Sequence, residues 1–227
     1  MKRLLALSLL AGALCAQEAT QKEPEPADIA MPAAGQPVED RAVVKQRIER
    51  FQTRFKEAKK DEKARAELLS KLGEWDHPDI YKVAMKYLRD RSDQVALAAV
   101  LACARQETSK AKSARTLWSH ASKEKRLEVR CAAMIAAGYL GYDKPTARKE
   151  AQKLFKKDDS EIRKASARYL GYVKDKSAFR LLAEKLNEPS YNSNDVERPM
   201  PESEKRRRWT RWNSNRPWVV WALSQLV

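Results

Sequence analysis

The sequence predicts an all-α protein, an α-solenoid of about five helical hairpins of which the last is interrupted by an insertion. A segment of the form VRCAAMIAAGYLG recurs along the chain, with copies that begin at residues 64, 95, 129 and 162. The copies are therefore 31, 34 and 33 residues apart, and a second helical segment lies between each copy and the next. A period in the low thirties that holds two helices is typical of α-solenoids.

The copies that begin at residues 95, 129 and 162 have small residues at fixed positions, and the copy at 64 is a weaker match. A β-branched residue such as Val129 is followed three places on by alanine, as at Ala132, and nine places on by alanine or glycine, as at Gly138. These intervals lie near whole helical turns, so the small residues share one face of a helix. We expect this face to pack closely against a neighbouring helix, with Gly73 and Gly171 in the place of Gly138.

The second helical segments span 78–90, 109–123, 145–157 and 176–187, and each has its own apolar stripe. Two of them begin at Pro78 and Pro145, where a proline is tolerated in the first turn, with Asp76 and Asp143 as predicted caps. Residues 39–59 form a further amphipathic helix, which we expect to pair with 64–75 and to cap the end of the stack. The helical repeats thus span 39–187.

The N-terminal 38 residues are expected to be a signal and a linker. Residues 1–16 have a basic start, an apolar run and small residues before Gln17, which predicts a secretory signal cleaved near Ala16. A lipoprotein signal that uses Cys15, or a signal retained as an anchor, is the alternative. Residues 17–38 are rich in proline, alanine and glutamate and read as a disordered linker. We expect an exported protein, periplasmic or secreted, without a transmembrane segment after cleavage.

The formal net charge is +15 and falls to +13 if Lys2 and Arg3 are removed with the signal. This excess of positive charge predicts nonspecific attraction to polyanions. The remaining cysteines, Cys103 and Cys131, occupy different positions of adjacent copies. The offset of six residues corresponds to about 9 Å of helical rise, too far for a disulfide, so we expect two buried thiols.

The repeat pattern stops after residue 187, and residues 188–215 are predicted to be an irregular basic insertion. A helix over 216–227 then resumes the pattern and caps the stack, with Trp218 and Trp221 in its core. The tryptophans of the insertion either cover the open end of the stack or bind a partner together with arginine. The candidate partner-binding residues are Lys205, Arg206, Arg207, Arg208, Trp209, Arg211 and Trp212.

The stretch IRKASARYLGYVKDKSAFRLLAEKL resembles the bacterial HEAT-like repeats that are grouped with phycobilisome-lyase-type repeats. The resemblance covers residues 64–187 and implies a right-handed stack of hairpins whose second helices line a concave face. It also implies a scaffolding role and supplies no catalytic residues. The sequence departs from the family pattern at Ala96, where an arginine is usual, and at Leu127, where an acid is usual.

An enzyme is not expected. The sequence lacks HExxH, CxxC, GxSxG and Walker spacings, and the two histidines, His77 and His120, have no ligand partner at metal spacing. We expect both histidines at the surface, and we expect no catalytic residue, metal, cofactor or small-molecule substrate. The sequence therefore favours an exported scaffold that binds a protein partner. Polyanion binding through the C-terminal segment is the alternative, and a nucleic-acid enzyme, as a few HEAT-like folds are, is a third hypothesis.

Overall fold

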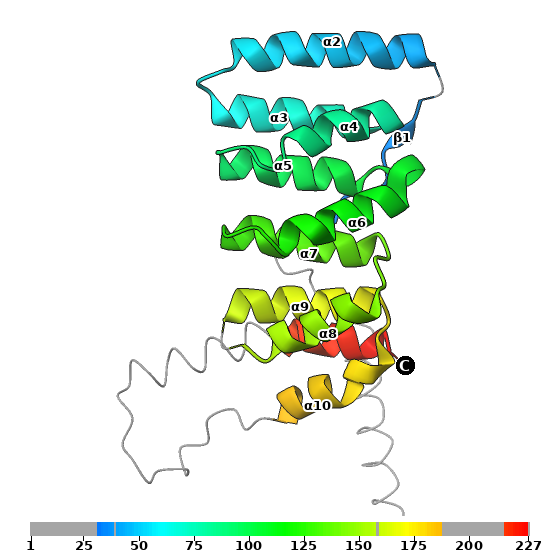
Figure 1. Ribbon diagram of the computed structural model, residues 1–227, viewed down its shortest axis with the longest axis vertical. Coiled ribbons are helices and arrows are strands. Elements are labelled where there is room, and N and C mark those ends of the chain that lie inside the picture. The colour runs from blue at the N-terminus through cyan, green and yellow to red at the C-terminus, as the bar shows by residue number, and fades with distance from the viewer. Residues whose placement is uncertain (1–30, 39, 158, 188–215, 227) are drawn as a thin grey trace, which may run out of the picture. The chain divides into compact units, whose positions relative to one another are not determined.

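The computed structural model describes residues 31–38, 40–157, 159–187 and 216–226. In this part of the chain the structure is all-helical, apart from a short parallel pairing of β1 (Gln36–Pro37) with β2 (Trp75–Asp76) (Figure 1). The all-α prediction is therefore confirmed for the described residues. None of their helices is long and apolar enough to cross a membrane.

The copies of the repeated segment form α3 (Glu62–Leu72), α5 (Asp93–Ala104), α7 (Leu127–Tyr139) and α9 (Ser160–Tyr172), which we call the core row. Each helix of the core row contacts the next one, and Figure 1 shows them one below another from cyan to yellow. Alanine and other apolar residues dominate α5 and α7, and most of their side chains are buried. This composition explains why α5 and α7 are buried on several sides, because a helix that is apolar all round has no polar face to expose to water.

Glycines allow the helices of the core row to approach each other closely. A Cβ atom added at Gly73 would lie 2.6 Å from the Cβ atom of Ala102 in α5. One at Gly138 would lie 3.0 Å from the Cα atom of Tyr169 in α9. A Cβ atom at Gly171 would lie 3.0 Å from the Cα atom of Ala222. The predicted close packing is thus confirmed, and the helix over 216–224 lies against α9 as the next member of the row.

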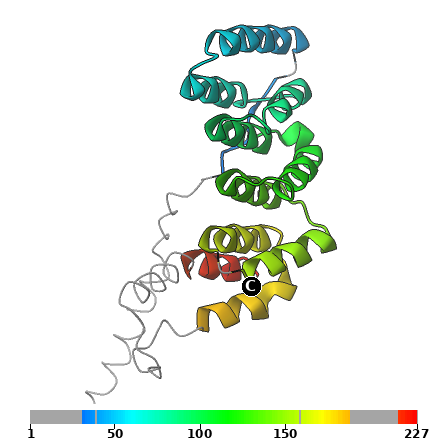
Figure 2. The same ribbon diagram turned by 60° about the vertical axis from the view of Figure 1, so that its left-hand side comes forward.

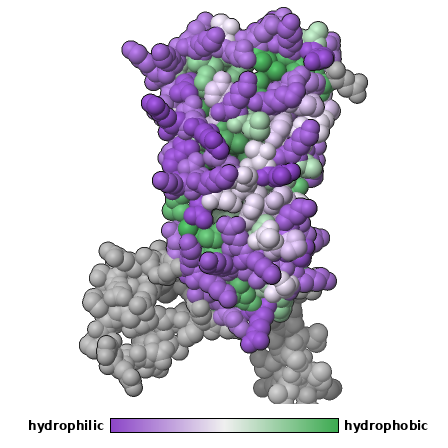
Figure 3. Space-filling view, viewed as in Figure 1, coloured by the Kyte–Doolittle hydropathy of each residue, from purple (hydrophilic) through white to green (hydrophobic). Residues whose placement is uncertain are grey.

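The second segments form α4 (Pro78–Lys86), α6 (Lys110–Ala121), α8 (Pro145–Phe155) and α10 (Phe179–Asn187), which we call the outer row. Short 3₁₀ turns, η1 (Glu107–Ser109) and η2 (Lys176–Ala178), precede α6 and α10. The helices α4, α6 and α8 contact α5, α7 and α9 respectively, and in Figure 2 they lie on one side of the core row. The face of the molecule seen in Figure 1 is mostly hydrophilic (Figure 3). The long helix α2 (Arg41–Glu57) contacts both α3 and α4, and it buries Val44, Phe51 and Phe55 as its spacing predicts.

Pro78 and Pro145 lie in the first turns of α4 and α8 as predicted, but the predicted caps are wrong. His77 caps α4, because its Nδ1 atom accepts a hydrogen bond from the backbone N–H of Asp79 at 3.1 Å. Asp76 instead accepts hydrogen bonds from the backbone N–H of Thr108 at 3.0 Å and from its hydroxyl at 2.7 Å. Asp143 pairs with Arg148. Both aspartates therefore hold turns or neighbouring chain segments rather than helix ends.

The buried side chain of Gln106 links the loop before α4 to the end of α5. Its Oε1 atom accepts a hydrogen bond from the backbone N–H of His77 at 3.1 Å. Its Nε2 atom donates to the carbonyl oxygens of Trp75 at 3.0 Å and Ala102 at 3.3 Å. Gln106 is fully buried, and these hydrogen bonds offset the free-energy cost of removing its amide group from water.

Residues 32–38, the last part of the predicted linker, run across the C-terminal ends of three helices of the core row. The backbone N–H of Gly35 donates to the carbonyl of Arg105, and that of Gln36 donates to the carbonyl of Glu74. The hydroxyl of Tyr139 donates to the carbonyl of Pro32 at 3.3 Å. This part of the linker is therefore a docked strand rather than a free tether, because helix ends leave carbonyl groups that need donors.

Cys103 and Cys131 are free thiols and both are buried, as the offset between their copies predicts. Burial raises the pKa of each thiol to about 12. Neither side chain is therefore a nucleophile at neutral pH, since the thiolate is the reactive form.

Candidate functional site

The binding residues predicted from the sequence, from Lys205 to Trp212, lie outside the described residues. The helix that follows them supports the packing role predicted for its tryptophans. Trp218 is buried, with the guanidinium of Arg168 4.2 Å from the centre of its ring. Trp221 is half-buried and lies edge-on to Tyr172, with ring centres 4.9 Å apart.

A pocket of about 430 Å³ lies between the outer helices α4 and α6. The end of α4 and the turn after it contribute Met85, Lys86, Leu88 and Arg89, and α6 contributes Arg115, Thr116, Ser119 and His120. The residues from α6 are spaced by three or four, so they occupy one face of that helix. The pocket exists because the outer helices pack mainly on the core row and barely touch each other.

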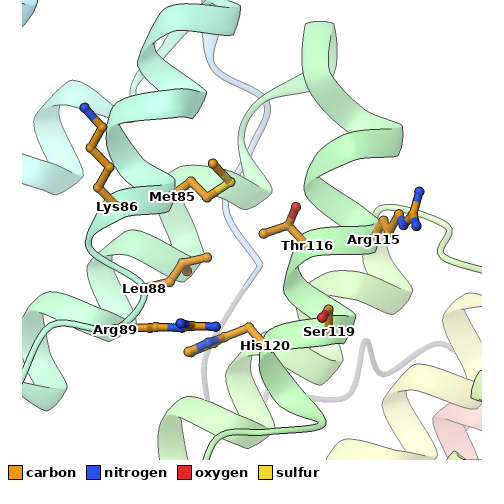
Figure 4. A pocket seen from close by; sticks show the side chains of 8 residues that line it. All are labelled: Met85, Lys86, Leu88, Arg89, Arg115, Thr116, Ser119 and His120. Atoms are coloured by element: carbon orange, nitrogen blue, oxygen red, sulfur yellow. The ribbon is translucent and has the colours of Figure 1, made fainter.

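Figure 4 shows how the lining side chains point. Arg89 and His120 approach each other at one end of the pocket, while Met85 and Thr116 face each other at the other end. Lys86 and Arg115 point away from the centre and lie at the rim. The hydroxyls of Thr116 and Tyr81 are hydrogen-bonded at 2.8 Å, which ties α6 to α4 behind the pocket.

The pocket is basic. Lys86, Arg89 and Arg115 are exposed, and none of them makes an ion pair with another described residue. The helix α6 carries Lys110, Lys112 and Arg115 and no acidic residue. Elsewhere on the outer helices cations are often paired, as Lys82 is with Asp79 at 2.8 Å and Arg180 is with Glu184 at 2.8 Å. The cations around the pocket are thus available for an anionic ligand.

His120 was expected at the surface, but it is buried, with 9% of its area exposed. It lies in the last turn of α6, on the face that turns toward α4 and α7. Burial lowers the pKa of His120, partly opposed by the carboxylate of Glu124. Its Nε2 atom is 3.4 Å from Glu124 Oε2, close enough for an ion pair but without the geometry of a hydrogen bond. At neutral pH the imidazole of His120 is therefore uncharged and lines one end of the pocket.

Glu124 does not cancel the positive charge of the pocket, because Arg126 neutralises it. The guanidinium of Arg126 donates to both carboxylate oxygens of Glu124, at 3.0 and 2.8 Å. These hydrogen bonds lower the pKa of Glu124 to about 2. Arg126 also reaches the carbonyl of Asp90 at 2.7 Å and the carboxylate of Asp93 at 3.1 Å, so it holds the loops of two adjacent helix pairs together.

A second depression, between α2 and α4, is larger, but both positively and negatively charged side chains line it. It has a volume of about 680 Å³ and is lined by Ile48 among charged side chains of both signs. Its cations lie near acids: Arg41 is 4.0 Å from Asp79, and Lys45 is 4.0 Å from Glu49. The mixed charge gives this depression no preference for an anion.

Comparison of the chain with protein-family models, with curated proteins and with solved structures found no match.

The described residues contain no group of three or more His, Cys, Asp or Glu side chains that could hold a metal ion. His77 caps α4, and both thiols are buried in the core row. The pocket between α4 and α6, with its exposed cations, is the candidate binding site.

The sequence did contain a weak sign of this site. The three cations of α6 without an acid, KAKSARTLWSHA, could have indicated an exposed basic helix. The pocket itself joins residues about 30 positions apart on two helices, and no local pattern specifies that pairing. The sequence pattern instead favoured the Lys205–Trp212 segment, because basic and aromatic residues are adjacent in the chain there.

Proposed function

We propose that this protein is an exported, non-enzymatic scaffold that binds a protein partner through the outer row of a HEAT-like α-solenoid of about five hairpins. Export to the periplasm or the medium rests on the predicted signal at residues 1–16. The solenoid interpretation is supported by the successive contacts of α3, α5, α7 and α9 and by the repeat period of the sequence.

One observation carries the binding role: the unpaired cations Lys86, Arg89 and Arg115 surround a pocket that also presents the exposed Met85. A single exposed apolar side chain is common on folded proteins, so what indicates a binding surface is the position of Met85 beside three cations. A cluster of cations beside an apolar wall suits a partner with acidic and apolar groups.

The alternative is polyanion binding, and the basic helix α6 adds an observation in its favour besides the net charge. The two functions differ in what they require of the surface. A polyanion responds to the number of cations on the protein and to salt. A protein partner responds to the positions of the cations and to the apolar contacts between them.

Capture of a partner from the native exported fraction tests the proposal. The bait is the full-length protein, compared with the double variants R89E/R115E and R50E/R54E. Arg50 and Arg54 are exposed on α2, so the second variant has the same change in net charge at a distant site.

The wild-type protein and R50E/R54E should retain the same protein, whereas R89E/R115E should lose it. Retention of no specific protein by any bait would argue against the scaffold. Equal weakening of both variants toward DNA and heparin, with a steep dependence on salt, would instead support polyanion binding.

A further inference from the structure

The pocket between α4 and α6 has a polar end and an apolar end. Arg89 and His120 form the polar end, and Met85 and Leu88 contribute the apolar wall (Figure 4). Leu88 is buried with 3% of its area exposed, whereas Met85 is 38% exposed. A ligand that fills the pocket therefore meets a fixed apolar floor and an adaptable thioether, which suits side chains of several shapes.

The size of the pocket limits what enters it. A volume of about 430 Å³ lies at the lower end of the range of ligand sites, which is about 300–1,000 Å³. This volume holds one or two side chains and not a folded element. The partner would therefore lie across α4 and α6 and insert side chains between them.

The charges select an anion. Arg89 presents a fork of N–H donors that matches a carboxylate, and Lys86 and Arg115 add positive charge at the rim on either side of the pocket. Glu124, the acid nearest to His120, is held by Arg126 and does not compete for Arg89. His120 is nine-tenths buried and its Nε2 atom has no hydrogen-bond partner among the described residues, so the polar end is only partly satisfied within this chain.

We propose that this pocket binds an acidic side chain and an adjoining apolar side chain from one peptide segment of the partner, with Arg89 as the carboxylate-binding residue and Met85 and Leu88 as the apolar contact. This inference rests on the proposed scaffold function and identifies its partner as a protein with an exposed acidic and apolar segment.

The composition of the pocket favours a peptide over a nucleic acid. Single-stranded nucleic acids are bound on aromatic side chains that stack on bases, together with cations. No Phe, Tyr or Trp side chain lines this pocket, and its apolar wall consists of Met85 and Leu88. A phosphate backbone would use Arg89, Lys86 and Arg115 but would leave Met85 and Leu88 without a role.

Fluorescence anisotropy with defined probes tests the inference on the full-length protein. The first probe is a labelled decapeptide of alternating glutamate and leucine. The second has glutamine in place of glutamate, the third has serine in place of leucine, and the fourth is a single-stranded DNA of ten nucleotides. The protein variants are R89E and, as a control for net charge at a distant site, R50E/R54E.

The glutamate–leucine peptide should bind most tightly, and both substituted peptides should bind at least about tenfold more weakly, because each lacks one of the two contacts. R89E should weaken the first peptide at least about tenfold, and R50E/R54E should change it less than about threefold. Circular dichroism should show the same helix content in all variants.

Tighter binding of the DNA than of the glutamate–leucine peptide, or equal loss in R89E and R50E/R54E, would overturn the inference. The same holds if the serine-containing peptide binds as tightly as the leucine-containing one. These failures would leave the scaffold function standing if the wild-type protein still captures a specific protein from the exported fraction. Loss of the scaffold function itself appears only in the capture experiment, as absence of any specific protein.

Discussion

The core row and the outer row of this protein contribute one helix each to every repeat but differ in composition and in burial. The helices α5 and α7 of the core row consist largely of alanine and apolar residues and are buried on most sides. The helices α6 and α8 of the outer row carry three lysine or arginine residues each and bury one stripe each. Small residues in the core row bring consecutive helices together, and larger residues in the outer row leave space between them.

This difference separates two tasks. The core row determines how consecutive helix pairs pack, because a Cβ atom added at Gly73, Gly138 or Gly171 would lie within 3.0 Å of the next helix. The outer helices make few contacts with one another, so their exposed side chains can vary at little cost to the stack. A site is therefore expected between outer helices, and the pocket between α4 and α6 fits that expectation.

The largest effect should come from enlarging a small residue in the core row. Ala102 of α5 is fully buried and lies against Gly73 of α3. Ala102→Val should lower the free energy of unfolding by about 1–3 kcal/mol, because added methyl groups in a packed core force the helices apart. Urea unfolding measures this change.

The matched control is Ala111→Val in α6, where the side chain is exposed. Only the lower helix propensity of valine should act there, at about 0.6 kcal/mol or less. Similar losses in the two variants would show that the core row is not packed more tightly than the outer row.

A loss of similar or smaller size should follow from removing the buried amide that joins neighbouring helix pairs. Gln106→Leu leaves the N–H of His77 and the carbonyl of Trp75 without their partner. The cost should be about 1–3 kcal/mol, the desolvation penalty of buried groups without hydrogen bonds. Thermal and urea unfolding report it, with the exposed Gln94→Leu as a neutral control. A Gln106 variant as stable as the wild type would contradict the role of this link.

A smaller effect should appear as a dependence of stability on pH at the end of α6. Since the pKa of His120 is lowered in the folded state, the unfolded chain binds its proton more readily. The contribution of His120 is therefore fully present above a pH of about 6.5 and declines as the pH falls below it. The charged groups around the imidazole are Glu124, Arg126, Arg89 and Arg115.

His120→Phe should flatten the loss of stability between pH 7 and pH 5 in urea unfolding. Glu124 does not affect the comparison between pH 7 and pH 5. Its pKa is lowered to about 2 in the folded protein, so its contribution to stability is lost only as the pH falls below about 4.5. An unchanged pH profile in His120→Phe would show that His120 titrates alike in both states.

The smallest effect on stability should come from the cations of the outer row. R89E/R115E should change the free energy of unfolding by no more than about 0.5 kcal/mol, because neither side chain makes an ion pair with a described residue. The same variant is expected to lose the partner, so stability and binding should separate in it. A large loss of stability would mean that these side chains belong to the fold.

Much of the fold could be predicted from the sequence, because helix formation and helix faces depend on spacing within one segment. The recurrence of VRCAAMIAAGYLG placed the core row and its close contacts, and the burial of Cys103 and Cys131 followed from the same register. The capping roles of Asp76 and Asp143 were predicted wrongly. Both carboxylates have partners, Thr108 and Arg148, that become available only once the chain folds back on itself.

The sequence by itself determined the helices, their order and which face of each is buried, since these follow from the periodicity of apolar and small residues. Only the tertiary structure decided how separate segments meet: the strand at 36–37 against Trp75–Asp76, the burial of His120, and the pocket between α4 and α6. The physical reason is that such contacts depend on the distance between helices, which is set by packing across the whole row and not by any one segment.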